Sequence, residues 1–466
     1  MMKIRGAHLA LVSACVLLAS LLIIPPAKAA TVVSSNTDVE GICTQTVDNA
    51  SSVVVNRYGA DCVVSFRRVG TTVWTIPAGV TKIQALIVAG GGGGGYDVAG
   101  GGGAGGLLYY GGETPKTPNG DTLTITSGNI AIEVGGGGAG ATSITAPFSA
   151  DSTGRGGNGS NSSITLPSST VLTAIGGGGG NSRNNTSAAQ NGGSGGGGGY
   201  GNGNGGTAAG NGTGSGTTLQ GFAGGRLTSG SGAGGGGGGA GGVGVNWSDT
   251  NASLNGAGGP GLQYLISGTA TYYGGGGGAG SWNNRGGPGG VGGGGAGGSM
   301  DSITCRANCT SDALARTGGS GTANTGGGGG GSGNATNSSP AGSGGSGIVI
   351  IRYTLNLAST VTISVPGGGF TYNTSKNISA TTNTGGFLTF LVNGKFIAGC
   401  RNILVNVANS FTGTCAYKPR IRSTTVVTVN FKPNDSSYST SSAASAAFFV
   451  ASRTNRRSSN FVMEYE

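Results

Sequence analysis

Glycine makes up more than a third of the middle of this chain and restricts what that part can become. Of the 107 glycines in 466 residues, 94 lie among the 258 positions from 90 to 347. Glycine loses more backbone entropy on ordering than any other residue, about 1–2 kcal/mol each, so a flexible linker is the first interpretation to consider. No G-X-Y period runs through the region, which excludes a collagen triple helix.

Strand-like segments frame the glycine-rich region and interrupt it, which a linker does not need. They are rich in β-branched residues and alternate in hydrophobicity, as strands do. The expected strands are residues 73–76, 82–88, 107–110, 123–125, 130–134, 163–166, 171–175 and 348–353. The sequence therefore favours an ordered β scaffold over a coil.

The boundaries of this region resemble the bacterial glycine-rich domain. The resemblance rests on residues 74–80 (WTIPAGV), on 85–88 (ALIV) entering the glycines at 90–95, and on 344–353 (GGSGIVIIRY). Residues 161–164 (NSSI) followed by 173–176 (TAIG) fit its internal pattern. Such domains are similar to glycine-rich tip adhesins of some phage tail fibres and to the glycine-rich domain of anaplastic lymphoma kinase. The resemblance implies polyglycine II helices, left-handed with about three residues per turn, packed side by side.

The composition changes near residue 355, where glycine becomes rare and short segments of alternating hydrophobicity, typical of strands, return. We expect strands at 361–365, 387–392, 426–431 and 448–450, enough for a β-sandwich. The segments that resemble bacterial immunoglobulin-like repeats are GFLTF (386–390), NGK (393–395), IAGC (397–400), CAYKP (415–419) and FKPND (431–435). Such repeats commonly act as spacers or presenters, which is what the resemblance implies for this part.

The predicted fold class is all-β, with a glycine-rich β scaffold that carries polyglycine II helices and is followed by an Ig-like β-sandwich. Four segments are expected: a signal peptide (1–29), a disulfide-bearing segment (30–69), the glycine-rich domain (70–354) and the Ig-like domain (355–466).

The N-terminus has the pattern of a secretory signal peptide. Lys3 and Arg5 precede an apolar run at 9–24, and Ala27-Lys28-Ala29 supplies a cleavage site. A retained anchor and a lipid on Cys15 are the alternatives. We expect a secreted or extracellular protein without a transmembrane segment in its mature chain, held at a surface, if at all, by non-covalent contacts. Cleavage removes His8, the only histidine, which excludes histidine-dependent catalysis and histidine-ligated zinc.

Six cysteines remain after cleavage and form three close pairs along the sequence: Cys43/Cys62, Cys305/Cys309 and Cys400/Cys415. An even number in an exported chain predicts disulfides, and pairing in sequence order closes the shortest loops. A cysteine-only metal site is the alternative, but Cys305 and Cys309 lack the usual two-residue spacing and a nearby second pair. No cofactor and no metal site is predicted.

Positive charge is concentrated in the C-terminal part. Residues 353–466 hold ten Lys or Arg against three Asp or Glu, whereas residues 31–352 hold twelve of each. A basic face favours acidic cell-wall polymers, polysaccharides or anionic lipids. Export makes nucleic acid the least expected partner, and a basic domain with no specific anionic partner is also compatible with these counts.

No sequence motif specifies catalysis. Ser194 lies in a G-x-S-x-G match, but the mature chain has no histidine and the surrounding sequence predicts no helix, so a nucleophilic role is not expected. Asp97 completes one G-G-x-G-x-D unit, and a calcium β-roll needs such units in tandem. Carboxylates are sparse, although two that are distant in sequence can still meet in space.

Aromatic residues set among the glycines are the candidates for ligand contact. The five candidates are Tyr200, Trp247, Tyr272, Tyr273 and Trp282. Aromatic side chains on loops stack on sugars or partner surfaces at small entropic cost. The alternative is that they fill gaps in the scaffold, which is the favoured interpretation for Tyr109 and Tyr110 on an expected strand.

The main functional hypothesis is non-catalytic adhesion or recognition, with a cell-wall or extracellular polysaccharide or a surface protein as partner. The second is a structural, self-assembling component of the cell envelope or extracellular matrix. The third is a secreted enzyme that acts on polysaccharides with carboxylates alone.

Overall fold

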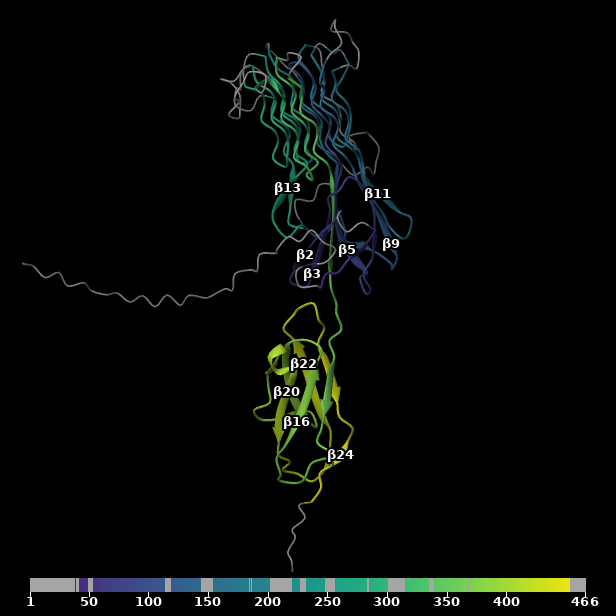
Figure 1. The fold of residues 1–466 in the computed structure, drawn as a ribbon, viewed down its shortest axis with the longest axis vertical. Helices are drawn as coiled ribbons and strands as arrows, with labels where there is room; N and C mark the ends of the chain where they lie inside the picture. The colour runs from purple at the N-terminus through teal and green to yellow at the C-terminus, as the bar shows by residue number, and fades with distance from the viewer. Residues whose placement is uncertain are drawn as a thin grey trace, which may run out of the picture.

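The computed structural model describes residues 38, 42–48, 53–113, 119–143, 154–183, 185, 187–201, 220–226, 232–247, 256–282, 285–300, 315–334, 339–367 and 369–452. Over these residues the fold is all-β, as the sequence predicts, with short helical turns such as η2 (Val407–Asn409). Figure 1 shows a bundle of glycine segments, a base of β-sheet below it and a C-terminal sandwich below the base.

The base consists of two sheets packed face to face. The first has the strand order β1 (Thr46–Val47), β4 (Gly70–Thr75), β9 (Asn129–Val134), β10 (Ser162–Thr165) and β11 (Val171–Ala174). The second has the order β2 (Val53–Tyr58), β3 (Asp61–Phe66), β14 (Ile348–Thr354), β5 (Lys82–Val88), β6 (Leu107–Tyr110) and β7 (Asn119–Gly120), and β8 (Leu123–Thr124) pairs with β5. The disulfide-bearing segment thus contributes β1 to the first sheet and β2 and β3 to the second. In the second sheet, β3 lies between β2 and β14.

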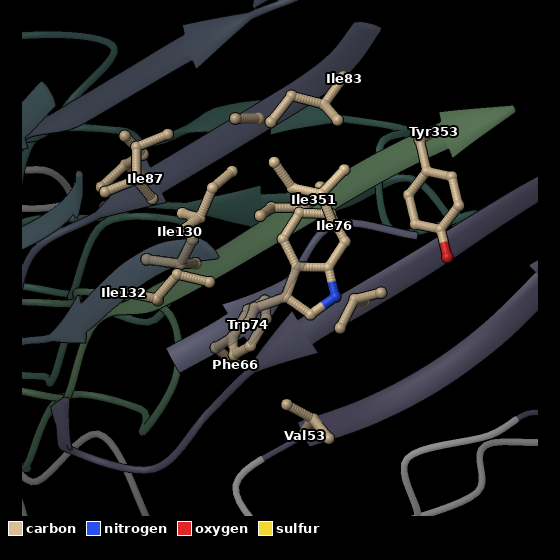
Figure 2. Packing of buried hydrophobic residues seen from close by; sticks show 14 of the residues in the cluster. Val53, Phe66, Trp74, Ile76, Ile83, Ile87, Ile130, Ile132, Ile351 and Tyr353 are labelled. Carbon is tan, nitrogen blue, oxygen red and sulfur yellow. The ribbon is translucent and has the colours of Figure 1, made fainter. Parts of the chain in front are cut away.

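The core of the base lies between these sheets. Figure 2 shows Trp74, Ile130 and Ile132 of the first sheet facing Phe66, Ile87 and Ile351 of the second. A hairpin formed by β12 (Leu262–Tyr264) and β13 (Thr271–Tyr273) contributes to a smaller core on the other face of the second sheet. Strands β5 and β14 are therefore buried on both faces, which explains their unbroken apolar runs.

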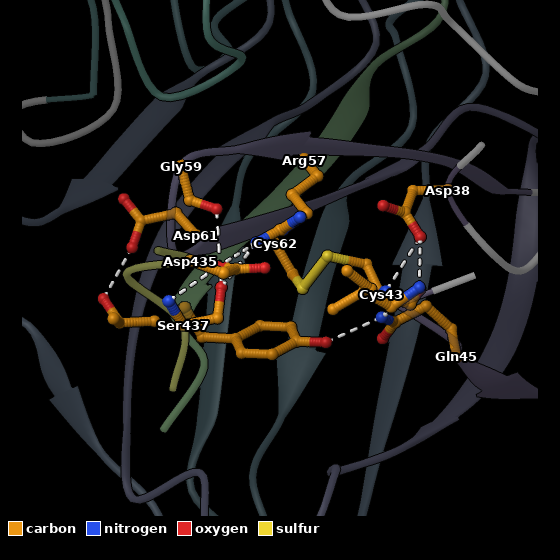
Figure 3. Close-up of a disulfide and its surroundings, with 12 residues drawn as sticks. Asp38, Cys43, Gln45, Arg57, Gly59, Asp61, Cys62, Asp435 and Ser437 are labelled. Carbon is orange, nitrogen blue, oxygen red and sulfur yellow. Dashed lines mark hydrogen bonds and ion pairs between the residues drawn. A yellow bond between two sulfur atoms is a disulfide. The ribbon is translucent and has the colours of Figure 1, made fainter. Parts of the chain in front are cut away.

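One buried glutamine satisfies the polar atoms of this core. The Trp74 indole N–H donates to Oε1 of Gln45 over 2.9 Å, and Nε2 of Gln45 donates to the Tyr353 hydroxyl over 2.6 Å. Burial is the main reason that the pKa of Tyr353 rises to about 12. Beside Gln45, the Cys43–Cys62 disulfide ties the N-terminal segment to β3 (Figure 3).

Eight of the glycine segments continue a strand. Residues 90–95 follow β5, residues 100–106 precede β6, and residues 341–347 precede β14. Five more join in the same way: 135–141 follow β9, 156–160 precede β10, 176–180 follow β11, 258–261 precede β12 and 274–280 follow β13. The strands therefore set where these eight segments begin and in which direction they run.

The hydrogen bonds of the segments repeat every third residue. In residues 90–95, Gly90 and Gly93 donate to Ser160 and Gly157. Gly91 and Gly94 donate to a second neighbouring segment, at 342–345. Gly92 and Gly95 donate to a third segment, at 100–103. The carbonyl groups of the same six residues accept from three further segments, at 138–141, 177–180 and 329–332.

A backbone that returns to the same neighbour every third residue has three residues per turn, and six surrounding segments correspond to side-by-side helix packing. The arrangement is that of polyglycine II, which the sequence resemblance implies. Its core is made of backbone.

The glycines are needed for space more than for unusual dihedral angles. A Cβ on Gly91, Gly93 or Gly94 would lie 2.0–2.1 Å from a carbonyl oxygen of a neighbouring segment. None of these three glycines has a left-handed φ. Any side chain would therefore push two segments apart and break their hydrogen bonds.

The C-terminal domain is a two-layer sandwich. One sheet has the order β15 (Val361–Ser364), β16 (Lys376–Thr382), β20 (Thr412–Tyr417). The other has the order β18 (Lys395–Phe396), β17 (Gly386–Val392), β22 (Val427–Pro433), β23 (Ser441–Ala444), with β19 (Ile403–Val405) also on β17. A short pair is formed by β21 (Thr424–Thr425) and β24 (Phe448–Phe449). The strand pairs within both sheets are antiparallel.

The sandwich has its own apolar core, which includes Phe370, Leu388, Phe390 and Phe431. The Cys400–Cys415 disulfide adds a covalent link. Together with Cys43–Cys62, it accounts for two of the three pairs predicted from the sequence. Cys305 and Cys309, like residues 1–29, where a signal peptide is predicted, lie outside the described residues.

An ion pair joins the base to the sandwich. Arg57, at the end of β2, contacts Asp435 over 2.5 Å and donates to the Ser437 hydroxyl over 2.8 Å (Figure 3). The Leu357 N–H donates to the Ser437 carbonyl over 2.7 Å. Burial acts to raise the pKa of Asp435, but hydrogen bonds from Ser437 and Arg57 and the guanidinium charge outweigh it, so this pKa is lowered.

The glycine packing predicts opposite outcomes for two substitutions in one segment. In Gly138→Ala, the Cβ would meet the Gly157 carbonyl oxygen at 2.1 Å, whereas in Gly136→Ala the nearest atom is Cγ1 of Val69 at 3.5 Å. We expect Gly138→Ala to lower the free energy of unfolding by about 1–3 kcal/mol or more and Gly136→Ala to change it by less than about 1 kcal/mol. Urea unfolding measures both, and equal losses would contradict the packing.

The junction predicts a pH dependence. Because the pKa of Asp435 is lowered on folding, its contribution to stability is fully present above the ordinary value of 3.8 and is lost as the pH falls below it. The pair is partly exposed, so we expect at most about 1 kcal/mol. Unfolding of the wild-type chain and of Asp435→Asn should therefore differ at pH 7 and converge in acid below that value. A difference that persists in acid would contradict this assignment.

Candidate functional site

Several glycine segments end together at the end of the bundle that lies farthest from the base, which we call the tip. Residues 90–95, 176–180 and 274–280 leave strands β5, β11 and β13 and run away from the base (Figure 1). Residues 194–199 run parallel to 176–181, since Gly178 donates to Ser194 and Asn181 to Gly197, each over 2.9 Å. The residues that follow these runs are therefore gathered at the tip.

Four of these residues form one cluster. The guanidinium carbon of Arg183 lies 4.1 Å from the centroid of the Trp282 ring and 5.5 Å from that of Tyr200. The two rings meet edge to face, 6.3 Å apart. On its other side, Nη1 of Arg183 lies 3.6 Å from Oδ2 of Asp97. We call Asp97, Arg183, Tyr200 and Trp282 the tip cluster.

The backbone that carries Asp97 is strained and firmly held. Asp97 and Val98 have φ angles of 64° and 50°, a region that β-branched residues such as valine rarely adopt. The Asp97 N–H donates to the Ser332 hydroxyl over 2.7 Å, and the Val98 carbonyl accepts from Tyr200 over 3.0 Å. Asp97 is buried, so its carboxylate is a fixed anchor for Arg183.

The cluster presents one large aromatic surface. Trp282 is 38% exposed, and the guanidinium of Arg183 holds its ring by a cation–π contact. Such a ring is accessible to a partner and loses little freedom on binding. The cluster therefore offers an aromatic face, a cation and the Tyr200 hydroxyl within one small area.

The remaining aromatic candidates do not join this cluster. Trp247 is 3% exposed, and Tyr273 is buried with Tyr264 in the smaller core of the base. Tyr272 is 44% exposed but lies on β13, at the base end. Of the five aromatics proposed from the sequence, the structure brings together Tyr200 and Trp282.

Tyr109 and Tyr110 pack as expected for side chains on a strand. Tyr109 is buried with its ring centroid 4.5 Å from that of Tyr264, and Tyr110 is half-buried against the main core. Burial is the main reason that the pKa of Tyr109 rises to about 12. These two rings belong to the scaffold.

The sequence interpretation missed Arg183 and the role of Asp97. Both follow glycine runs within three residues, and position after a run is the signal that identifies tip residues. Ser194 is completely buried among the segments. No group of three or more His, Cys, Asp or Glu that suits a metal ion occurs in the described part of the chain, and Asp97 pairs with Arg183 instead.

The exposure of the three tryptophans predicts a fluorescence result. Trp74 and Trp247 are buried, so acrylamide should quench mainly Trp282 in the folded chain. Trp282→Phe should therefore remove most of the quenchable emission, while Trp247→Phe should leave it. If Trp247→Phe removes the quenchable component, the assignment of Trp282 as the exposed ring is wrong.

Comparison with known protein families identifies the glycine-rich part of the chain. A sequence model of a protein family described as "glycine-rich domain" matches residues 67–354. No curated protein matches the chain. Among the residues that the structure describes, no helix is long and apolar enough to cross a membrane. The two disulfides are consistent with an extracellular protein.

Proposed function

We propose that this chain, which belongs to the glycine-rich domain family, is an exported, non-catalytic adhesion or recognition protein that binds its partner with the tip cluster. The observation that carries the proposal is the exposed Trp282 ring, which Arg183 holds at the end of the bundle farthest from the rest of the protein. The similarity to glycine-rich tip adhesins of phage tail fibres belongs to the same proposal.

The scaffold supports a binding role because it organises the site before the partner arrives. The segments that lead to Asp97, Arg183 and Trp282 are hydrogen-bonded laterally along their length. A side chain on such a support has lost most of its freedom already, so binding costs less entropy. The tip cluster therefore suits a repeated, specific contact.

The partner class follows from the groups presented. An aromatic face stacks on the C–H face of a sugar ring or on an apolar side chain, and Arg183 and Tyr200 add polar groups. We propose an extracellular or cell-wall polysaccharide, or a surface protein, as the partner. The C-terminal domain, as a bacterial Ig-like repeat, then serves as a spacer.

Three of the described carboxylates are held in ion pairs. Asp61, Asp97 and Asp435 each pair with a different arginine. Each of these carboxylates is therefore engaged in a structural ion pair within the protein. This arrangement supports a non-catalytic role at these three positions.

The proposal predicts a specific loss of binding. We expect Trp282→Ala to weaken binding of the full exported chain, residues 31–466, to whole cells or to a captured polysaccharide by about tenfold or more, because a central aromatic contact is removed. Tyr272→Ala is the matched control, an exposed aromatic at the base end, and should change binding less than about twofold. Biolayer interferometry against a panel of polysaccharides and cells measures both.

Other outcomes would point elsewhere. Equal losses from Trp282→Ala and Tyr272→Ala would contradict a site at the tip. Concentration-dependent self-assembly without ligand binding would favour the structural alternative. Release of sugar products that stops when one Asp or Glu is removed would favour an enzyme.

A further inference from the structure

A second surface with ligand-binding features lies on the C-terminal domain, at the end opposite the junction with the base. Strand β17 begins beside the junction loop, where Asn434 donates to the Gly385 carbonyl, and ends at the Asn393–Gly394 turn. A groove of about 530 Å³ lies at that turn. One wall of the groove is residues 392–398 and the other is residues 416–425. We call this groove the basal groove; it belongs to the C-terminal domain and not to the β-sheet base.

The two walls of the basal groove are tied together. Nδ2 of Asn393 donates to the Thr424 carbonyl over 3.2 Å, and Oδ1 of Asn393 accepts from the Val426 N–H over 2.8 Å. The Cys400–Cys415 disulfide joins the chain just after the first wall to the residue just before the second. The groove is thus built into the domain and does not depend on loop closure.

The basal groove combines positive charge with exposed apolar groups. Lys395, Lys418 and Arg420 line it and are exposed. Phe396 and Ile421 also line it and are 53% and 71% exposed. The guanidinium carbon of Arg401 lies 3.5 Å from the centroid of the Phe396 ring, which adds a further cation at the rim.

The charge of this groove has no compensation within the described part of the domain. Asp435 is the only acidic residue among residues 355–452, and it pairs with Arg57 at the opposite end. Unpaired cations beside apolar side chains produce a positive potential that attracts anions. A ligand that matches must carry repeated negative charge and an apolar face.

We propose that the basal groove binds a segment of an acidic polysaccharide. Carboxylates of the polymer would meet Lys395, Lys418 and Arg420, and the C–H faces of its rings would lie on Phe396 and Ile421. A concave groove with Asn393, Ser423 and Thr425 along its walls suits a polar chain of rings better than a flat lipid surface. This site is separate from the tip cluster, so the molecule has a binding surface at each end.

The test uses the full exported chain, residues 31–466, with disulfides intact. We expect it to bind immobilised polygalacturonate, and dextran sulfate as a second acidic polymer, in a salt-sensitive manner, and not to bind neutral dextran. Lys418→Gln/Arg420→Gln should weaken binding at least tenfold. Phe396→Ser/Ile421→Ser should weaken it about tenfold without changing net charge. Unchanged thermal unfolding shows that each variant is folded.

Matched variants separate the groove from general charge and from the tip. Lys82→Gln/Lys432→Gln removes the same charge from exposed positions outside the basal groove and should weaken binding less than about twofold. Tyr272→Ala changes an exposed aromatic outside both surfaces and should also alter this binding less than about twofold. Failure of the groove proposal shows as acidic-polymer binding that Lys418→Gln/Arg420→Gln does not weaken. Failure of the tip proposal shows as ligand binding that Trp282→Ala does not weaken, so the two failures are distinguishable.

Several results would overturn the proposal. One is that Lys418→Gln/Arg420→Gln and Lys82→Gln/Lys432→Gln weaken polymer binding equally. Another is that the chain binds neither polygalacturonate nor dextran sulfate. Capture of the chain by phosphatidylglycerol vesicles but not by polygalacturonate would assign the surface to membranes. Binding that requires residues 453–466 and survives both groove substitutions would assign it to the C-terminal segment.

Discussion

The lateral hydrogen bond between glycine backbones is the interaction on which the rest of this structure depends. An inner segment such as residues 90–95 donates to three neighbours and accepts from three others, so its backbone groups are satisfied without side chains. Each bond contributes only about 0.5–1.5 kcal/mol net, less than or comparable to the entropy lost by ordering a glycine. The bundle is therefore stable as a cooperative unit, attached to a base that orders the ends of its segments.

The base supplies what glycine cannot. Its core around Trp74, Ile87 and Ile351 has ordinary hydrophobic packing, and its strands lead directly into the glycine segments. Strand pairing fixes the starting points and directions of the segments that adjoin a strand. Lateral hydrogen bonding then places the other segments among them, beyond the sheets. This division of roles places an arginine and two aromatic rings, from three separate segments, beside one another at the tip.

The sequence predicts the parts of this structure that depend on local pattern. Alternation identifies β9 and β17, and short spacing identifies the Cys43–Cys62 and Cys400–Cys415 pairs. It does not indicate β2 and β3, and the pairing of β3 with β14 joins residues almost 300 positions apart. Nor does the sequence show that Trp247 is buried and Trp282 exposed, because both are flanked by Ser and Asn. The difference depends on where the glycine segments end in the folded bundle.

The position of β14 gives the proposed functions a mechanical basis. This strand follows glycine residues 341–347, is paired with β3 on one side and β5 on the other, and continues through Leu355 and Leu357 into the C-terminal domain. A pull between the tip and the basal groove would load β14 along its own axis. The antiparallel hydrogen bonds on both of its sides would then resist in shear and share the load, and the Arg57–Asp435 pair would hold the two domains in line with it. A protein anchored at one end and attached at the other needs this property.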